Sequence, residues 1–318
     1  MKFYWSDREG KSPPSGCTLS KRSFSSQIQT LSLAKQVELP SPRSAKVLKQ
    51  TFFPDRKTWI EKVEKALSLI NRKELQKVVL ARVCILELDH APDPFAIASS
   101  LKQKAEGAFV FCLQSKTDAF LGATPERLFA RKERAIISEA VAGTRRRGKT
   151  VEEDEMLQKE LLSSSKDLLE FSPVQLHLQN VLSPLCTHSV SFTPISIHKT
   201  KNVQHLYTQC TGTLKNSVKD HDIITSLHPT PALCGTPRHK AFSLIQELEP
   251  FDRGLYGGVI GWSTPEASEW IVGIRSCLLR GKTATLFSGT GIVEGSNPET
   301  EWDELNQKLK LYDGILDH

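Results

Sequence analysis

Two charged residues, Lys77 and Glu126, lie beside apolar segments of the sequence, where folding alone does not explain a charged side chain. Lys77 opens the apolar run Lys77–Leu88, and Glu126 follows Pro125 between two apolar segments. A lysine at a strand end often extends to solvent, whereas a buried lysine has a lowered pKa and can act as a base. Pro125 fixes a turn that presents the Glu126 carboxyl group on a rigid edge, although a simple ion pair with Arg127 is the alternative. The residues alone leave both interpretations open.

A third segment of interest lies near the C-terminus. Two glycines flank Thr290 within Phe287–Ser296, and glycines let backbone N–H groups approach an anion. The alternative is a tight bend or a bulge. On the helix expected next, Glu301, Glu304 and Lys308 are spaced i, i+3, i+7 and share one face. Carboxylates on one face can bind a divalent cation, or the face can simply be charged and solvated.

The elements that must position these residues follow from hydrophobic periodicity and turn residues. Strands and helices alternate after residue 56, which indicates an α+β chain with much antiparallel sheet. Expected helices span 57–71, 93–104, 151–163, 166–182 with a break near Pro173, 220–227, 237–247 and 298–316. Expected strands span 77–88, 108–114, 119–122, 127–131, 135–141, 190–198, 207–214, 257–262, 269–279 and 283–293.

The first fifty residues differ in composition from the rest. They are rich in Ser, Lys and Pro and hold only short apolar stretches, such as Phe3–Trp5. We predict that residues 1–50 form an abbreviated N-terminal segment, which contributes strands or is a partly disordered arm. Residues 51–318 then form the catalytic domain.

Composition and charge exclude several classes of protein. With 39% hydrophobic and 25% charged residues among 318, the chain is neither fibrous nor largely disordered. Its longest apolar run, Ala108–Leu113, is too short to span a bilayer. The net charge of +6 comes from lysines and arginines interleaved with acids, which favours an anionic small molecule over nucleic acid. Seven scattered cysteines without a CxxC pair are typical of a reducing cytoplasm.

Taken together, these segments resemble the chorismate-utilising enzymes, the family of anthranilate, aminodeoxychorismate, isochorismate and salicylate synthases. The resemblance covers the chain from about residue 52 to its C-terminus. It implies an anthranilate synthase component I-like, chorismate-binding α+β fold with large antiparallel sheets flanked by helices. The motifs that carry it, in the family's order, are KVVLAR (77–82), GATPERLF (122–129), AGTRRRG (142–148), LLSSSKDLLE (161–170), VQHLYTQCTGTL (203–214), LHPTPALCGTPR (227–238), YGGVIGW (256–262), EWIVGIRS (269–276) and SGTGIVEGSNPETEWDE (288–304).

Within this family, the residue at the Lys77 position separates members by nucleophile. Lysine there resembles the members that use water, and those that use ammonia work with a glutamine amidotransferase. The segment 228–232, which ends at Ala232, resembles isochorismate synthases, since salicylate synthases and ammonia users typically carry threonine at its last position. The resemblance thus implies an isochorismate synthase, an isomerase of menaquinone or siderophore biosynthesis. It also implies a monomer without an amidotransferase subunit. The alternatives are a salicylate synthase or a non-catalytic chorismate-binding relative.

The resemblance also implies roles for individual residues. Lys77 acts as the base that activates water at C2 of chorismate, and Glu126 as the acid that protonates the departing C4 hydroxyl. Glu170 and Glu304 hold Mg²⁺, with Glu301 joining them. The residues implied for substrate binding are His228, Thr230, Ala232, Arg275, Gly289, Thr290, Gly291 and Lys308.

Three features depart from the family pattern. The N-terminal part is short. Thr290 stands between the two glycines where relatives mostly have a small apolar residue, and it could crowd the carboxylate pocket. Phe171 follows Glu170 where relatives usually have histidine, so metal affinity could differ.

Overall fold

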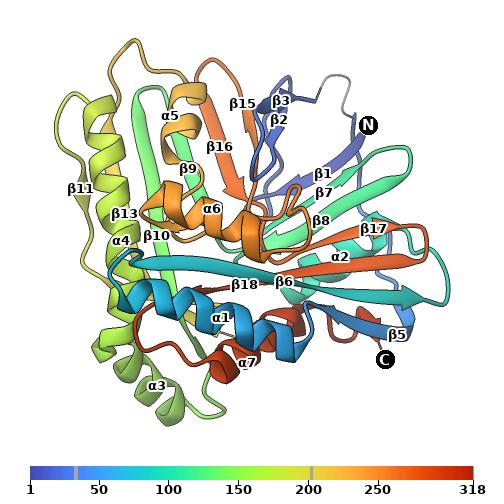
Figure 1. Ribbon diagram of the computed structural model, residues 1–318. Helices are drawn as coiled ribbons and strands as arrows, with labels where there is room; N and C mark the ends of the chain where they lie inside the picture. The colour runs from blue at the N-terminus through green and yellow to red at the C-terminus, as the bar shows by residue number, and fades with distance from the viewer. Residues whose placement is uncertain (32–34, 201–202, 318) are drawn as a thin grey trace.

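The computed structural model describes residues 1–31, 35–200 and 203–317. Two large, mostly antiparallel sheets lie beside each other, with helices on their outer faces (Figure 1). A group of buried aromatic and aliphatic side chains, including Trp5, Phe111 and Ile271, packs where strands of the two sheets meet. The mixed α+β class predicted from the sequence is therefore present.

The first sheet carries the long strand that begins at Lys77. Its order is β19-β5-β6-β18-β17-β8-β7-β1-β4, with β14 paired to β6. β6 and β18 pair over ten residue pairs, from Thr283 opposite Glu87 to Ile292 opposite Val78. The strands are β1 (Lys2–Ser6), β4 (Lys35–Gln36), β5 (Ala45–Phe53), β6 (Lys77–Leu88), β7 (Phe109–Gln114), β8 (Asp118–Thr124), β14 (Gly235–Thr236), β17 (Ser276–Arg280), β18 (Thr283–Ile292) and β19 (Leu316–Asp317).

The second sheet has the order β11-β13-β10-β9-β16-β15-β2-β3, with β12 paired to β13. Its longest pairing joins β10 and β13 and is interrupted by an irregularity between Ala142 and Thr144. The strands are β2 (Thr18–Arg22), β3 (Ile28–Thr30), β9 (Arg127–Lys132), β10 (Ala135–Arg146), β11 (Ser191–Phe192), β12 (Ser196–Lys199), β13 (Val203–Thr213), β15 (Val259–Ser263) and β16 (Ala267–Val272).

Helices cover the outer faces of both sheets. α1 and α7 lie against the β6–β18 pair, and α4 runs along β10 and β13 (Figure 1). Side-chain caps fix several helix starts, such as Asp55 for α1 and Asn297 for α7. The helices are α1 (Arg56–Asn71), α2 (Pro94–Lys104), α3 (Val151–Ser163), α4 (Ser165–Leu182), α5 (Asp220–Leu227), α6 (Arg238–Leu248) and α7 (Pro298–Leu309), with short 3₁₀ turns at Ser183–Leu185 and Lys310–Tyr312.

The structure corrects three of the predicted elements. α4 passes through Pro173 without a break, because Phe171, Val174 and Leu178 at helical spacing are buried against the second sheet. The segment 190–198 forms two short strands, β11 and β12, rather than one. The final helix ends at Leu309, and the chain continues as a 3₁₀ turn and the short strand β19.

The strand predicted for 269–279 is also wrong. It is divided into β16 and β17, because the chain crosses from the second sheet to the first at 273–275. Arg275 has a positive φ of 50° at this crossing.

The N-terminal segment is built into the fold. β1 pairs with β7 inside the first sheet, and only 1% of Trp5 is exposed. Arg8 donates hydrogen bonds to the Pro125 carbonyl and to Glu139, so the segment also braces the turn that carries Glu126. The described part of residues 1–50 contains strands β1 to β4 and the start of β5. β5 (Ala45–Phe53) continues across the predicted boundary at residue 50.

The charge pattern of the surface agrees with the sequence analysis. The densest basic cluster, Arg145–Arg147, is paired throughout, and its partners are Asp167, Glu153 and Asp154. None of the described helices is long and apolar enough to cross a membrane.

Candidate active site

Two crossings between the sheets place Glu126 and Arg275 beside each other. Glu126 lies between β8 of the first sheet and β9 of the second, and Arg275 between β16 of the second and β17 of the first. The crossings are joined by hydrogen bonds from Val272 N to Glu126 O (3.1 Å) and from Ala123 N to Arg275 O (3.2 Å). The strands on either side of each crossing are held by sheet pairing. The backbone that carries the Glu126 and Arg275 side chains is therefore held in place.

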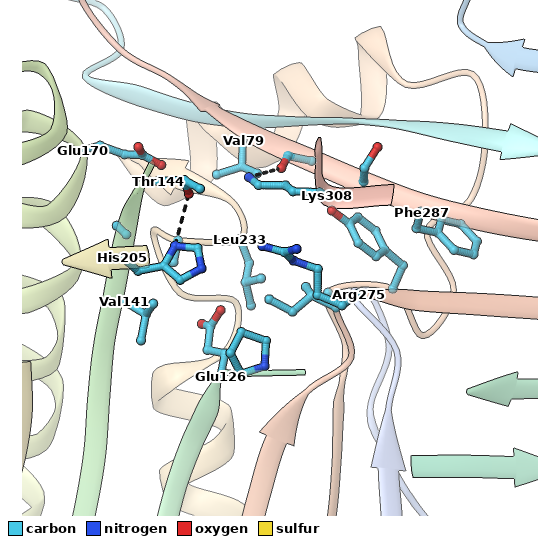
Figure 2. A pocket seen from close by; sticks show the side chains of 18 of the residues that line it. Val79, Glu126, Val141, Thr144, Glu170, His205, Leu233, Arg275, Phe287 and Lys308 are labelled. Atoms are coloured by element: carbon cyan, nitrogen blue, oxygen red, sulfur yellow. Dashed lines mark hydrogen bonds between the residues drawn. The ribbon is translucent and has the colours of Figure 1, made fainter. Parts of the chain in front are cut away.

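The end of β18 that β17 does not cover forms the neighbouring wall of the site. β17 pairs with β18 only from Thr283 to Leu286, whereas β6 pairs with β18 as far as Ile292. Lys308 of α7 lies against this end and donates to the Gly289 carbonyl at 2.8 Å. Figure 2 shows this contact, with Glu126, His205 and Arg275 arranged around the same space.

A cavity lies between these walls, and many of the residues predicted as site residues from the sequence line it. Ala232 from the 228–236 loop and Glu170 from α4 also reach it. The lining residues are Val79, Pro125, Glu126, Val141, Ala142, Gly143, Thr144, Glu170, His205, Ala232, Leu233, Arg253, Tyr256, Gly257, Ile274, Arg275, Phe287, Ser288, Gly289 and Lys308.

Glu126 is a buried carboxyl group without the ion pair that was its alternative explanation. It is 8% exposed, and burial raises its pKa to about 7. Arg127 pairs instead with Glu139 (2.9 Å) and Glu269 (2.9 Å). A carboxyl group with this pKa can hold a proton near neutral pH and can donate it.

Lys77 is fully buried, so the solvent-exposed alternative is wrong. Its Nζ lies 3.1 Å from the Glu170 carbonyl oxygen and 3.3 Å from Glu170 Oε1. Burial lowers the pKa of the ammonium group, although Glu170 acts in the opposite direction. Lys77 is not among the residues that line the cavity, but it contacts Glu170, which is. An added Cβ on Gly291 would overlap Glu170 Oε1 and would lie 2.9 Å from Lys77 Cε, so glycine makes room for this pair.

Three carboxylates gather with lysines on the α7 side of the cavity. Lys308 Nζ lies 2.6 Å from Glu304 Oε1, and Lys166 Nζ lies 2.7 Å from Glu301 Oε1. Burial raises the pKa of Glu170. Burial has the same effect on Glu304, but Lys308 and other neighbours outweigh it and lower the pKa of that carboxyl group. The solvated charged face considered for these residues is therefore wrong.

These carboxylates fit the donor chemistry that Mg²⁺ prefers. Mg²⁺ usually binds one or two carboxylates and keeps several waters. Within the described ranges, no three His, Cys, Asp or Glu side chains converge as a ready-made cage. A pair formed by Glu170 and Glu304, whose charges interact, is consistent with that mode of binding. Glu301 already has a partner on each oxygen, which are Lys166 and Thr290.

Four residues predicted for substrate binding, among them Gly291, do not line the cavity. His228 is fully buried, its Nε2 lies 2.7 Å from the Gly257 carbonyl, and its ring packs edge-on against Phe24. Thr230 is 4% exposed in the same loop. Thr290 points toward α7 and lies 2.6 Å from Glu301. The structure thus gives these residues supporting positions, and it brings Ala232, Arg275, Gly289 and Lys308 to the cavity.

His205 lines the cavity and was missed by the sequence analysis. Its Nδ1 lies 3.0 Å from the Gly143 carbonyl oxygen and 3.1 Å from the Thr144 hydroxyl oxygen. Because the carbonyl can only accept, we assign the proton to Nδ1, and the hydroxyl then accepts as well. Nε2 is buried without a hydrogen-bond partner among the described residues. Burial lowers the pKa of His205 to about 3, so the ring is neutral and offers an acceptor. A histidine within the apolar stretch of VQHLYTQ was the available signal.

Tyr256 was missed as well. It stacks on Phe287 at the cavity wall. Its hydroxyl fills the space where a Cβ on Gly289 would be. Its position within the YGGVIGW motif was the available signal.

Comparison with known proteins places the chain in a family. The model of the chorismate binding enzyme family matches residues 16–316. The chain belongs to the chorismate binding enzymes. It is 42% identical over 276 residues to isochorismate synthase 2, chloroplastic, of Arabidopsis thaliana, which covers 86% of this chain and 49% of the relative. The chain spans about half the length of the curated relatives that it matches first.

Solved structures show the same fold. MenF, the menaquinone-specific isochorismate synthase of Escherichia coli, has a TM-score of 0.86 at 25% identity, covering 96% of this chain and 86% of that one. Anthranilate synthase component I of Streptococcus pneumoniae has a TM-score of 0.74 at 25% identity, covering 83% and 59%. The predicted anthranilate synthase component I-like fold is therefore confirmed.

Proposed function

We propose that this protein is an Mg²⁺-dependent isochorismate synthase that converts chorismate to isochorismate. Membership of the chorismate binding family supports the substrate. The names of its relatives support the reaction, because the Arabidopsis and E. coli proteins are both called isochorismate synthases. The observation that carries the proposal is a buried, protonatable glutamate, Glu126, in the cavity wall, together with a buried lysine, Lys77, that contacts Glu170 of the same wall.

The two groups suit a concerted displacement. Neutral Lys77 takes a proton from water as its oxygen bonds to C2 of chorismate, and the ring double bonds shift. The C4–O bond breaks, and Glu126 protonates the departing hydroxyl, which leaves as water. Burial lowers the pKa of Lys77 and raises that of Glu126 to about 7, which are the directions that the two roles require. Lys77 contacts Glu170 in this structure and does not itself line the cavity, so the role of Lys77 requires that contact to change.

The cationic side of the cavity suits a dicarboxylate. Arg275 and Lys308 reach the space beside the backbone of Gly289. The guanidinium of Arg275 can bind a planar carboxylate through two parallel hydrogen bonds. The free Nε2 acceptor of His205 suits a hydroxyl donor of the substrate. Gly291 contributes room for Glu170 rather than a direct contact.

Glu170 and Glu304 would hold the Mg²⁺, with Glu301 in the outer shell. The bound ion would orient a substrate carboxylate and neutralise its charge. Lys308 and Lys77 now contact these carboxylates, so they would exchange partners when the ion is present.

Related proposals follow for partners and location. Lys77 supports water as the nucleophile, hence a chain that acts without an amidotransferase subunit, and we propose a monomer. The paired arginines at 145–147 give no support to nucleic-acid binding. Seven free cysteines support a reducing compartment, and we propose the cytoplasm. The product would serve menaquinone or siderophore biosynthesis.

Incubation of the purified protein with chorismate, with and without Mg²⁺, tests the proposal when the products are separated by liquid chromatography. We expect isochorismate only with Mg²⁺ and no salicylate or pyruvate. Salicylate together with pyruvate would support the salicylate synthase alternative. Ala232 at the cavity wall argues against that alternative, because salicylate synthases typically carry threonine at this position. Binding of chorismate without any product would support a non-catalytic relative.

A further inference from the structure

Thr290 occupies a position between two carboxylates. It lies on β18 between Gly289, where an added Cβ would meet Tyr256, and Gly291, where it would meet Glu170. Because side chains alternate along a strand, Thr290 faces the other way, toward α7. Its hydroxyl oxygen lies 2.6 Å from Glu301 Oε2 and 3.0 Å from Glu304 Oε1. It is 2% exposed, so water does not compete freely for either contact.

A single hydroxyl proton serves two acceptors at this position. The hydroxyl can donate to one carboxylate at a time, and the shorter contact favours Glu301. Lys166 holds the other oxygen of Glu301 at 2.7 Å, so both oxygens of that carboxylate are engaged. On Glu304, Thr290 and Lys308 both approach Oε1, which leaves Oε2 as the oxygen available for a cation.

We propose that the Thr290 hydroxyl is a positioning group for the divalent cation: its hydrogen bond, which can switch between the two carboxylates, holds both in the arrangement in which Glu304 presents a free oxygen to the cation and Glu301 does not. The inference rests on the proposed function only in taking Glu304 as a cation ligand. Hydrogen bonds to ligating carboxylates orient them, and loss of such an outer contact typically weakens metal binding by about 10- to 100-fold. The residue between the glycines thus sets cation affinity instead of crowding the substrate.

Titration of the full-length protein with Mn²⁺, without chorismate, tests this inference. Free Mn²⁺ is counted by electron paramagnetic resonance, and Mg²⁺ is then added as a competitor. Thr290→Val keeps the side-chain shape and removes the hydroxyl, and Thr290→Ser keeps the hydroxyl. We expect about 10- to 100-fold weaker binding of both ions by the valine variant and near wild-type binding by the serine variant.

Thr208→Val is the matched control. The Thr208 side chain is fully buried, and its hydroxyl donates to the Thr193 carbonyl at 2.6 Å rather than to a carboxylate. We expect this control to bind the ions as the wild type does. Thermal melting of each variant identifies any loss of folding.

The outcomes separate this inference from the proposed activity. Equal affinities for Thr290→Val and the wild type would overturn the inference, whether or not isochorismate forms. Weak binding by Thr290→Val with rescue by serine would support it, even if the wild type fails to convert chorismate. With chorismate present, the valine variant should need more Mg²⁺ for half-maximal rate but keep its kcat at saturating ion. A lower kcat at saturation with unchanged affinity would overturn the inference.

Discussion

Burial moves the pKa values of Lys77 and Glu126 in opposite directions. The ammonium group becomes easier to deprotonate, and the carboxyl group keeps its proton up to a pH of about 7. At neutral pH an unburied lysine would be charged and an unburied glutamate would be ionised. The position of each residue in the fold thus moves its pKa in the direction that the proposed acid and base roles require.

The pH profile of kcat/KM should therefore contain the titration of Glu126. With Lys77 neutral, raising the pH through about 7 removes the proton that Glu126 donates, so kcat/KM falls. Glu126→Gln should lower kcat by about 10²- to 10⁴-fold and remove this pH dependence from the residual rate. A glutamine variant that keeps both the rate and the profile would show that another group is the acid.

Substitution of Lys77 tests the base. Lys77→Met keeps an unbranched side chain of similar length and removes the amine, and we expect a loss of about 10²- to 10⁴-fold in kcat. Lys73→Met is the control, because Lys73 forms a surface ion pair with Glu294. Steady-state assays with saturating Mg²⁺ measure both variants. Wild-type turnover by Lys77→Met would contradict the assignment.

At the residue scale, the sequence identified the two charged side chains to which the acid and base roles are assigned. Lys77 and Glu126 stood out because their neighbours are apolar, but the residues alone left open whether either side chain is buried. His205 and His228 could not be told apart in this way, since both are histidines in apolar surroundings. Only the register of β13 and the packing of the 228–236 loop decide which ring reaches the cavity.

At the scale of elements, the site depends on interruptions of the sheets. The chain leaves one sheet for the other at Glu126 and again at 273–275, and β18 extends beyond its pairing with β17. These interruptions leave space that continuous strands would fill. Periodicity did not predict the second crossing, because Ile274 continues the apolar pattern from β16 into β17 and a local pattern carries no information about sheet pairing.

Gly291→Ala tests how closely β18 and α4 approach. The new methyl group would overlap Glu170 Oε1 and lie 2.9 Å from Lys77 Cε, so both side chains must move. We expect a loss of about 1–3 kcal/mol in the free energy of unfolding, because overpacking displaces neighbours. We also expect kcat to fall at least about tenfold. Urea unfolding and steady-state kinetics measure the two effects, and an alanine variant with wild-type values of both would contradict the placement of Glu170.

At the scale of the whole molecule, the candidate site joins parts that are distant in sequence. Lys77, Glu126, Glu170, Arg275 and Glu304 come from different elements, and Arg8 of the N-terminal segment braces the turn before Glu126. The family motifs predicted which segments take part, and the alternation of elements predicted the α+β class. The orientation of Thr290 toward α7 required the strand register, which the sequence alone did not supply.

Stability should reflect the burial of Glu126. Its pKa in the folded state is about 7, above the ordinary value of 4.5, so the folded chain holds this proton more tightly than the unfolded chain. This carboxyl group therefore destabilises the fold fully above pH 7 and not below about pH 4.5. Glu126→Gln should raise the free energy of unfolding at pH 8 by up to roughly 3 kcal/mol, with the gain vanishing toward pH 4.5. Urea unfolding across this pH range measures it, and a gain that grows as pH falls would contradict the burial effect.

The most direct test of the account is to run the reaction in water enriched with ¹⁸O, with Mg²⁺ present, and to analyse isochorismate by mass spectrometry. If Lys77 activates a water that adds at C2 while the C4 hydroxyl departs, each product molecule carries one atom of ¹⁸O, located at C2. Unlabelled isochorismate would mean that the hydroxyl migrates within the substrate. That result would contradict the roles given to Lys77 and Glu126.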